Sequence, residues 1–231
     1  MARPLTAAAP PVPIEAVFFD IGETLVNEGE IYGRWADWLD VPRHTFLATL
    51  GSNLAAGGSF MELFERFRPG FDLKTEQRRR AAAGVPNGFG PADLYPDARE
   101  CLAALREQGL YIGVAGNQPA AAAEQFAALG LDVDVVGISA LWGVEKPAPG
   151  FFGRCVAAAG RAPAALLYVG DRIDNDVRPA LAYGLQVAHL RRGPWGYIQH
   201  DEEALARCLF RPDSLAELPA LVARHNALAL P

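Results

Sequence analysis

The sequence predicts an α/β fold, in which a parallel sheet is covered by helices on both faces and a small all-helical domain is attached to it. Short apolar segments typical of buried strands alternate with helical segments, and most of these helices end at a Gly. One stretch near the N-terminal end breaks the alternation with helical spacings alone. We therefore expect a flexible tail at residues 1–13, an α/β core at residues 14–27 and 91–231, and a helical domain with its linker at residues 28–90.

The first strand is predicted at the segment IEAVFFD, from Ile14 to Asp20. It is a short apolar run with β-branched and aromatic residues, and it ends in a turn at Gly22. The preceding residues, MARPLTAAAPPVP, are rich in Pro and Ala and lack the apolar stretch of a secretory signal. The strand is therefore expected to open the core directly after the tail.

The stretch from about Glu28 to Ala83 is predicted to be helical, because large apolar side chains recur there at helical spacing. The positions with this spacing are Tyr32, Trp35, Trp38, Leu39, Met61, Phe64 and Phe67. Breaks between helices are expected at Gly57-Gly58, Pro69-Gly70 and Gly84. The basic run Arg78-Arg79-Arg80 is interpreted as a solvated helix face. We expect this insertion to lie over the carboxyl edge of the sheet.

Beyond the linker, four further strands alternate with helices. The strands are predicted at Leu110–Ala115, Val133–Ile138, Ala165–Val169 and Leu185–Leu190. The helices are predicted at Pro96–Gln108, Pro119–Leu129, Pro149–Ala159, Asn175–Tyr183 and Ser214–Arg224. This order builds βα units, which place the strands parallel to one another in a Rossmann-like sheet.

Length, charge and cysteine content exclude several classes of protein. The 231 residues suffice for a core with an insertion, and a hydrophobic fraction of 51% excludes disorder over the whole length. A net charge of −6 argues against nucleic acid or an anionic membrane as a partner, and no apolar run reaches the ~20 residues of a membrane span. Three cysteines without a CxxC pair indicate neither a disulfide framework nor a zinc site, so a cytoplasmic location is expected.

Polar residues follow four of the five predicted strands, although a packed core alone would not require them. In chain order, these residues include Asp20 and Thr24, Asn117, Lys146, and Asp171 with Asp176. Ligands of parallel α/β sheets bind outside the carboxyl ends of the strands. We therefore expect these side chains to meet in one cleft.

Asp20, Asp171 and Asp176 would bring three carboxylates into this cleft. Such a cluster repels itself unless a cation lies between its members. Mg2+ is the natural ion because it prefers hard oxygen ligands and keeps water and substrate phosphate in its shell. Lys146 is one of two lysines among 21 cationic residues, and its flexible side chain can hold a carboxylate and a phosphate together. The N–H groups at the helix start near Asn117 would also favour an anion.

These motifs resemble those of the haloacid dehalogenase-like hydrolases, over nearly the whole chain from Ile14 onward. The family motifs are matched, in chain order, by Asp20 and Thr24 in DxDxT, by Lys146-Pro147, and by Gly170-Asp171 with Asp176. The resemblance implies that Asp20 is a nucleophile that forms an aspartyl-phosphate, that Lys146 assists it, and that the helical insertion is the family's cap domain.

The resemblance also implies a metal site and a phosphate site. The ligands of Mg2+ would be Asp20, the backbone carbonyl of Gly22, Asp171 and Asp176. The residues around the substrate phosphate would be Thr24, Gly116, Asn117 and Lys146.

Two positions depart from the family pattern. The second Asp of the first motif, which is the general acid and base in the family's phosphatases, is Gly22 here. Its carbonyl can still bind a metal, but the acid–base contribution, typically about 10²–10⁴-fold, is lost. The neighbouring Glu23 is expected to point to the other side of the turn. Gly116 stands where the family usually has Ser or Thr, so Asn117 or backbone N–H groups would bind the phosphate.

We expect a Mg2+-dependent phosphatase that hydrolyses a small phosphorylated metabolite through an aspartyl-phosphate. A 2-haloacid dehalogenase is an alternative, since a halide needs no proton, but such enzymes lack the acidic pair of Asp171 and Asp176. A phosphonate hydrolase would need a Schiff-base lysine from the cap, where Lys74 is the one available. The changes at Gly22 and Gly116 also fit a binding or regulatory protein with little turnover.

Overall fold

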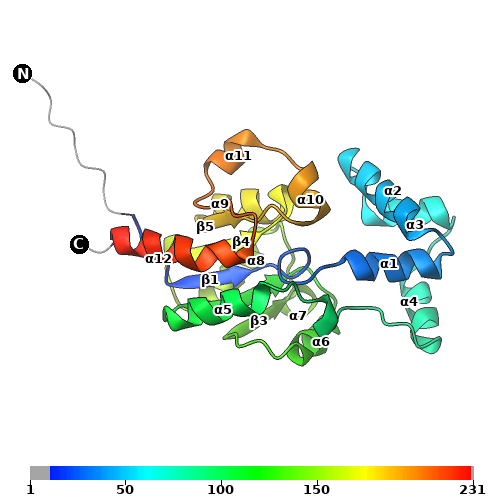
Figure 1. Ribbon diagram of the computed structural model, residues 1–231, viewed down its shortest axis with the longest axis horizontal. Coiled ribbons are helices and arrows are strands. Elements are labelled where there is room, and N and C mark those ends of the chain that lie inside the picture. The colour runs from blue at the N-terminus through cyan, green and yellow to red at the C-terminus, as the bar shows by residue number, and fades with distance from the viewer. Residues whose placement is uncertain (1–10, 230–231) are drawn as a thin grey trace, which may run out of the picture.

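The computed structural model describes residues 11–229, and a five-stranded parallel sheet with the strand order β3-β2-β1-β4-β5 forms its centre (Figure 1). The strands are β1 (Ala16–Phe19), β2 (Tyr111–Gly116), β3 (Val135–Ile138), β4 (Leu166–Gly170) and β5 (Gln186–His189). Each strand lies inside its predicted segment or extends one residue beyond it, and the predicted α/β class is confirmed. Of the predicted tail, residues 1–10 lie outside the described residues.

Helices cover both faces of the sheet, and the side chains of β1 alternate between the two faces. Val17 and Phe19 belong to an apolar cluster with α5 (Ala98–Glu107), α6 (Ala122–Ala128) and α12 (Leu218–Ala229). Ala16 and Phe18 belong to a second cluster with α8 (Pro149–Ala159) and α9 (Arg178–Tyr183). All four strand residues are fully buried, as expected for a central parallel strand.

Several short helical segments are not predicted by the sequence pattern. They are α7 (Ser139–Trp142), α10 (Gly193–Ile198), α11 (Glu202–Ala206), the 3-10 turns Pro91–Asp93 and Pro163–Ala165, and a π-helical turn at Ile173–Val177. The helix predicted at Ser214–Arg224 begins as a 3-10 turn, Leu215–Glu217, and continues as α12. The π-helical turn takes the place of the first residues of the helix predicted at Asn175–Tyr183. Within residues 11–229, no helix combines the length and the apolar character that crossing a membrane requires.

The inserted segment forms four helices with an apolar cluster of their own. They are α1 (Gly29–Trp38), α2 (Arg43–Ala55), α3 (Phe60–Phe67) and α4 (Leu73–Ala82), and Figure 1 shows them gathered at one end of the molecule, beyond the sheet. Trp35, Phe46, Phe64 and Phe71 pack together between these helices. We refer to α1–α4 as the helical insertion.

Met61 lies in a helix as its spacing predicts but faces solvent, and the expectation for the basic run is wrong in part. Met61 is 42% exposed, while the neighbouring Leu63 and Phe64 are buried. The basic run is not a solvated face throughout, because Arg80 is fully buried. Its guanidinium lies 3.8 Å from the centre of the Trp35 ring and donates a 2.7 Å hydrogen bond to the carbonyl of Pro86. Stacking on an aromatic ring favours this burial of a cation.

Candidate active site

The carboxyl ends of β1 and β4 lie side by side where the strand order of the sheet reverses direction. Asp20 directly follows β1, and its backbone N–H donates a 2.9 Å hydrogen bond to the carbonyl of Val169 in β4. Asp171 directly follows β4. Parallel α/β sheets bind their ligands in the crevice at such a reversal. Strand pairing thus brings together two carboxylates that are far apart in the sequence.

After Asp20 the chain makes a tight turn. The N–H groups of Leu25 and Val26 both donate to the carbonyl of Ile21, over 3.0 Å and 2.9 Å, and Glu23 adopts a φ of 52° in the left-handed region. The turn brings Glu28 back against Gly22. A Cβ atom placed on Gly22 would lie 2.6 Å from Oε1 of Glu28, so the carboxyl of Glu28 occupies the space that a side chain at position 22 would need.

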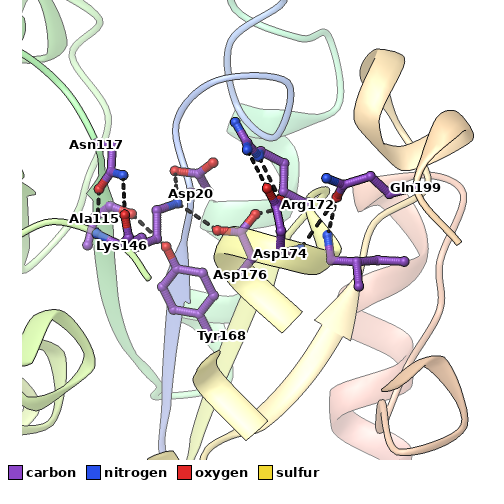
Figure 2. Close-up of polar contacts among 10 residues, drawn as sticks. Asp20, Ala115, Asn117, Lys146, Tyr168, Arg172, Asp174, Asp176 and Gln199 are labelled. Atoms are coloured by element: carbon purple, nitrogen blue, oxygen red, sulfur yellow. Dashed lines mark hydrogen bonds and ion pairs between the residues drawn. The ribbon is translucent and has the colours of Figure 1, made fainter. Parts of the chain in front are cut away.

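Lys146 lies between two of the three predicted carboxylates (Figure 2). Its Nζ atom is 2.7 Å from Oδ1 of Asp20 and 2.6 Å from Oδ1 of Asp176, and its side chain is 2% exposed. Burial alone would lower the pKa of Lys146, but the carboxylates of Asp176 and Asp20 outweigh it and raise the pKa above its ordinary value. The amine is therefore protonated at neutral pH.

Asn117, at the end of β2, fixes the backbone of Lys146. Its Nδ2 donates to the carbonyl of Lys146 and its Oδ1 accepts from the N–H of Lys146, each over 2.8 Å. Both polar atoms of the Asn117 side chain are thus engaged with the loop that carries the lysine. In this structure the Asn117 side chain holds the backbone of Lys146. The phosphate contact predicted for Asn117 stays a prediction.

Asp171 and Asp176 complete a group of three carboxylates. One oxygen from each, together with one from Asp20, lies within 4.8 Å of the others. Asp171 is 1% exposed, and its Oδ2 has no hydrogen-bond partner among residues 11–229. Burial and the carboxylates of Asp176 and Asp20 raise the pKa of Asp171 well above its ordinary value. A carboxylate oxygen buried without a partner has the chemistry of a metal ligand.

Asp176 differs from Asp171 because both of its oxygens have partners. Oδ1 accepts from Nζ of Lys146, and Oδ2 accepts a 3.0 Å hydrogen bond from the N–H of Arg172. Burial raises the pKa of Asp176 to about 6, although Lys146 opposes the rise. Its direct contacts fit a residue that holds Lys146 in place.

A small cleft of about 100 Å³ opens in front of these groups. The residues that line it are Asp20, Gly22, Glu23, Glu28, Asn117, Gln118, Lys146, Asp171, Arg172, Asn175 and Trp195. Five predicted site residues are thus among those lining one cleft: Asp20, Gly22, Asn117, Lys146 and Asp171. Asp176 is not among the lining residues and contacts Nζ of Lys146.

Thr24 and Gly116 are not among the residues that line this cleft. Thr24 is fully buried, and its hydroxyl oxygen finds no hydrogen-bond partner in the part of the chain that the structure describes. A Cβ atom on Gly116 would lie 2.7 Å from Oδ1 of Asp20. Gly116 therefore allows the end of β2 to approach the Asp20 carboxylate closely.

The two glutamates near the turn have different surroundings. Both oxygens of Glu23 accept hydrogen bonds, Oε1 from the N–H of Glu28 (3.0 Å) and Oε2 from the hydroxyl of Tyr95 (2.6 Å). Oε2 of Glu28 accepts a 2.5 Å hydrogen bond from the hydroxyl of Tyr32. Burial raises the pKa of Glu28 to about 7. The hydrogen bond from Tyr32 opposes this rise, and the negative charges of Glu23 and Asp20 add to it.

Six lining residues were not predicted as site residues: Glu23, Glu28, Gln118, Arg172, Asn175 and Trp195. The expectation that Glu23 points to the other side of the turn is wrong, since Glu23 lines the cleft. Arg172 and Asn175 stand beside Asp171 in the sequence, which is a signal that could have found them. Glu28 is eight positions beyond Asp20, and only the shape of the turn brings it back to Gly22. Trp195 belongs to α10, beyond β5, where no motif marks it.

Comparison with known proteins gives matches over most of the chain. The family model described as haloacid dehalogenase-like hydrolase matches residues 14–184. A protein of Methanopyrus kandleri named glyceraldehyde 3-phosphate phosphatase is 29% identical over 206 residues, 79% of this chain and 86% of that protein. A protein of the same name from Pyrococcus furiosus is 25% identical over 228 residues, 90% and 92% of the two chains.

Among solved structures, a HAD-hydrolase from Bacillus subtilis bound to magnesium is similar in fold. It superposes with a TM-score of 0.69 at 15% identity, over 91% of this chain and 99% of that one.

Proposed function

The chain belongs to the haloacid dehalogenase-like hydrolase family, and on this premise we propose that it is a phosphatase that hydrolyses a small phosphate monoester through a phosphorylated Asp20. The observation that carries the proposal is the contact of Lys146 with Asp20, in the lining of a cleft that is also lined by Asp171. A protonated lysine beside the nucleophile offsets the repulsion between a carboxylate and an anionic phosphate. The phosphatase names of two relatives that match most of the chain support the same reaction.

We propose that Mg2+ is held by Asp20, Asp171 and the backbone carbonyl of Gly22. The unpartnered Oδ2 of Asp171 supports this set, since an orphaned buried carboxylate oxygen fits a hard cation. When bound, the ion would neutralise charge on the substrate phosphate. Asp176, whose oxygens accept from Lys146 and from the N–H of Arg172, would orient Lys146 from behind.

Asp20 would act as the nucleophile through Oδ2, because Oδ1 already contacts Lys146. A lone pair of Oδ2 forms the new bond to phosphorus while the bond from phosphorus to the ester oxygen breaks. Water then attacks the same phosphorus, releases inorganic phosphate and regenerates the carboxylate. Lys146 and Arg172 supply positive charge in the cleft throughout both steps.

The substrate class that we propose is a small phosphorylated metabolite. The cleft holds only about 100 Å³ and is lined mainly by polar and charged side chains, which suits a phosphate with a short organic group. The match to two proteins named for a three-carbon phosphate points the same way. A cytoplasmic location agrees with three cysteines that are all free thiols.

The test is a panel of phosphate esters assayed with Mg2+ and with a chelator, for the wild-type chain and Asp20→Asn. We expect turnover of 4-nitrophenyl phosphate and of short alkyl phosphates that requires the metal and that Asp20→Asn abolishes. Unchanged rates in Asp20→Asn would remove the nucleophile. Hydrolysis of chloroacetate that persists under chelation would instead identify a dehalogenase.

A further inference from the structure

The proposed reaction does not yet include a group that supplies a proton to the leaving group. The position of Glu28 bears on this question. An alkoxide is a poor leaving group, and a positioned acid is typically worth about 10²–10⁴-fold in such a step. Gly22 has no side chain to donate that proton. A carboxyl group that reaches the cleft from elsewhere in the chain can supply it.

The carboxyl of Glu28 lies where a side chain on Gly22 would begin. A Cβ atom on Gly22 would meet Oε1, Cδ and Oε2 of Glu28 at 2.6, 2.8 and 3.2 Å. The backbone of Gly22 is outside the left-handed region, so this crowding comes from the glutamate and not from the backbone. The chain thus carries a carboxyl group beside position 22, delivered from the start of α1.

The two oxygens of Glu28 have different partners. Oε2 accepts from the hydroxyl of Tyr32, one helical turn further along, and this hydrogen bond fixes the carboxyl. Oε1 accepts no hydrogen bond within residues 11–229 and is the atom nearest to Gly22. Both Glu28 and Gly22 line the cleft that holds Asp20, Lys146 and Asp171. The free oxygen therefore lies close to the Cβ position of Gly22, and it belongs to a residue that lines the same cleft as the reacting groups.

Glu23 is the other carboxylate at this edge of the cleft, and its contacts exclude it from the same task. Its Oε1 accepts from the N–H of Glu28, and its Oε2 accepts from the hydroxyl of Tyr95. These contacts tie Glu23 to the turn and to the N–H of Glu28. Glu23 supports the turn that carries Glu28, while Glu28 keeps an oxygen for the substrate.

We infer that Glu28 is the general acid and base of this enzyme, in place of the side chain that Gly22 lacks; this inference rests on the proposed phosphatase function. In the first step the Glu28 carboxyl gives its proton to the ester oxygen as the bond from that oxygen to phosphorus breaks. In the second step the Glu28 carboxylate takes a proton from the water that attacks the phosphorus on Asp20. The proton balance closes over one cycle.

The test compares Glu28→Gln with the wild-type chain on two esters, glycerol 3-phosphate and 4-nitrophenyl phosphate. For glycerol 3-phosphate we expect kcat/KM to fall by about 10²–10⁴-fold, because its alkoxide needs the proton. Nitrophenolate needs none, so we expect a burst of one equivalent at close to the wild-type rate. A slow steady state should follow, since the base for water is missing. If the rate of the first step fell equally with both esters, or fell with neither, the assignment would be overturned.

Two further variants serve as matched comparisons. Glu30→Gln changes an exposed carboxylate of the same helix that pairs with Arg43 outside the cleft, and we expect wild-type kinetics from it. The variant Glu23→Gln keeps the Glu28 carboxyl. If this variant is slower than the wild type, we expect its burst rate and its steady-state rate to fall by the same factor. If Glu23→Gln alone gave the burst and the slow steady state, Glu23 and not Glu28 would be the acid and base.

A rescue experiment tests whether the two positions are equivalent. Combining Gly22→Asp with Glu28→Ala empties the space beside position 22 and returns a carboxyl to it. We expect this double variant to hydrolyse glycerol 3-phosphate at least about tenfold faster than Glu28→Ala alone. No gain over Glu28→Ala in a folded protein would contradict the equivalence.

The design separates this inference from the function on which it rests. A wild-type chain without activity on either ester overturns both. An active wild type that Asp20→Asn silences, together with an unaffected Glu28→Gln, overturns the role of Glu28 alone.

Discussion

Asp171 is a buried carboxylate with one oxygen that no group in residues 11–229 satisfies. A buried group of this kind destabilises a fold unless a cation or a proton compensates it. The raised pKa of Asp171 expresses the same cost, since burial and two neighbouring carboxylates disfavour its charge. The Asp171 carboxylate therefore lowers the folding stability of the metal-free chain, and the same carboxylate provides a group that can bind a cation.

The variant Asp171→Asn tests whether this single carboxylate lowers the stability of the metal-free chain. We expect the metal-free variant to unfold at a higher temperature than the wild type, by a few degrees, since about 1 kcal/mol moves the midpoint of a chain this long by roughly 2–4 °C. We also expect added Mg2+ to raise the midpoint of the wild type and not that of the variant. Thermal unfolding with EDTA and with MgCl2 measures both. A variant that responds to Mg2+ like the wild type would exclude Asp171 as a ligand.

The positions of some residues could be predicted from the sequence, and those of others could not. Asp20, Lys146 and Asp171 could be placed at strand ends because short apolar runs reveal parallel strands and the residues after them share one edge. Glu28 could not, since its approach to Gly22 depends on the left-handed Glu23 and on how the turn closes. The burial of Arg80 depends on the Trp35 ring, which belongs to another helix.

At the scale of elements, Asp97 joins three segments on the side of the core that carries α5. It stands at the start of α5 and accepts hydrogen bonds from Arg192, just before α10, from the hydroxyl of Ser214 (2.7 Å) and from the N–H of Leu215 (3.0 Å). Burial alone would raise the pKa of Asp97, but the hydrogen bonds from Arg192 and Ser214 outweigh it and lower the pKa.

Asp97→Asn should therefore destabilise the fold and flatten its response to acid. Hydrogen bonds to a charged group are worth about 1.5–3 kcal/mol, and the variant should lose a free energy of unfolding of that order at neutral pH. Because the folded carboxyl binds its proton less readily than the unfolded one, its contribution is complete above the ordinary pKa of about 3.9 and fades as the pH falls further.

Urea unfolding of both chains between pH 3 and pH 7 measures the two effects. The difference between wild type and variant should shrink at the acid end of this range. A difference that stays constant across the range would show that the charge of Asp97 contributes nothing.

The short elements α7, α10 and α11 explain why the sequence pattern predicts the sheet and misses parts of its surroundings. A buried strand is defined by its own apolar residues. Each of the five strands accordingly lies inside its predicted segment or extends one residue beyond it. A helix of four to six residues is too short for a 3.6-residue period to be recognised. Such helices form because of what they pack against.

At the scale of the whole molecule, α10 connects the core to the helical insertion. The Trp195 ring stacks on Phe60 of α3, with 6.3 Å between ring centres. The guanidinium of Arg172 lies 4.8 Å from the centre of the same Trp195 ring. Trp195 and Arg172 both line the cleft. The insertion therefore contacts a residue that lines the cleft through an aromatic pair.

Phe60→Leu removes the aromatic partner and keeps an apolar side chain. An aromatic pair is worth about 0.5–1.5 kcal/mol beyond its buried area, so we expect KM to rise by about two- to tenfold with little change in kcat. Steady-state kinetics on one alkyl phosphate measure this. A fall in kcat at constant KM would show that the pair acts on the chemical step and not on the binding of substrate.

The two lysines of this chain have opposite surroundings, and this has a practical consequence for experiments. Lys146 is locked between Asp20 and Asp176, while Lys74 is exposed on α4. An amine-reactive dye or a biotin ester will therefore modify the side chain of Lys74 and spare that of Lys146. A fluorophore attached to Lys74 would report on the helical insertion while Lys146 in the cleft stays unmodified.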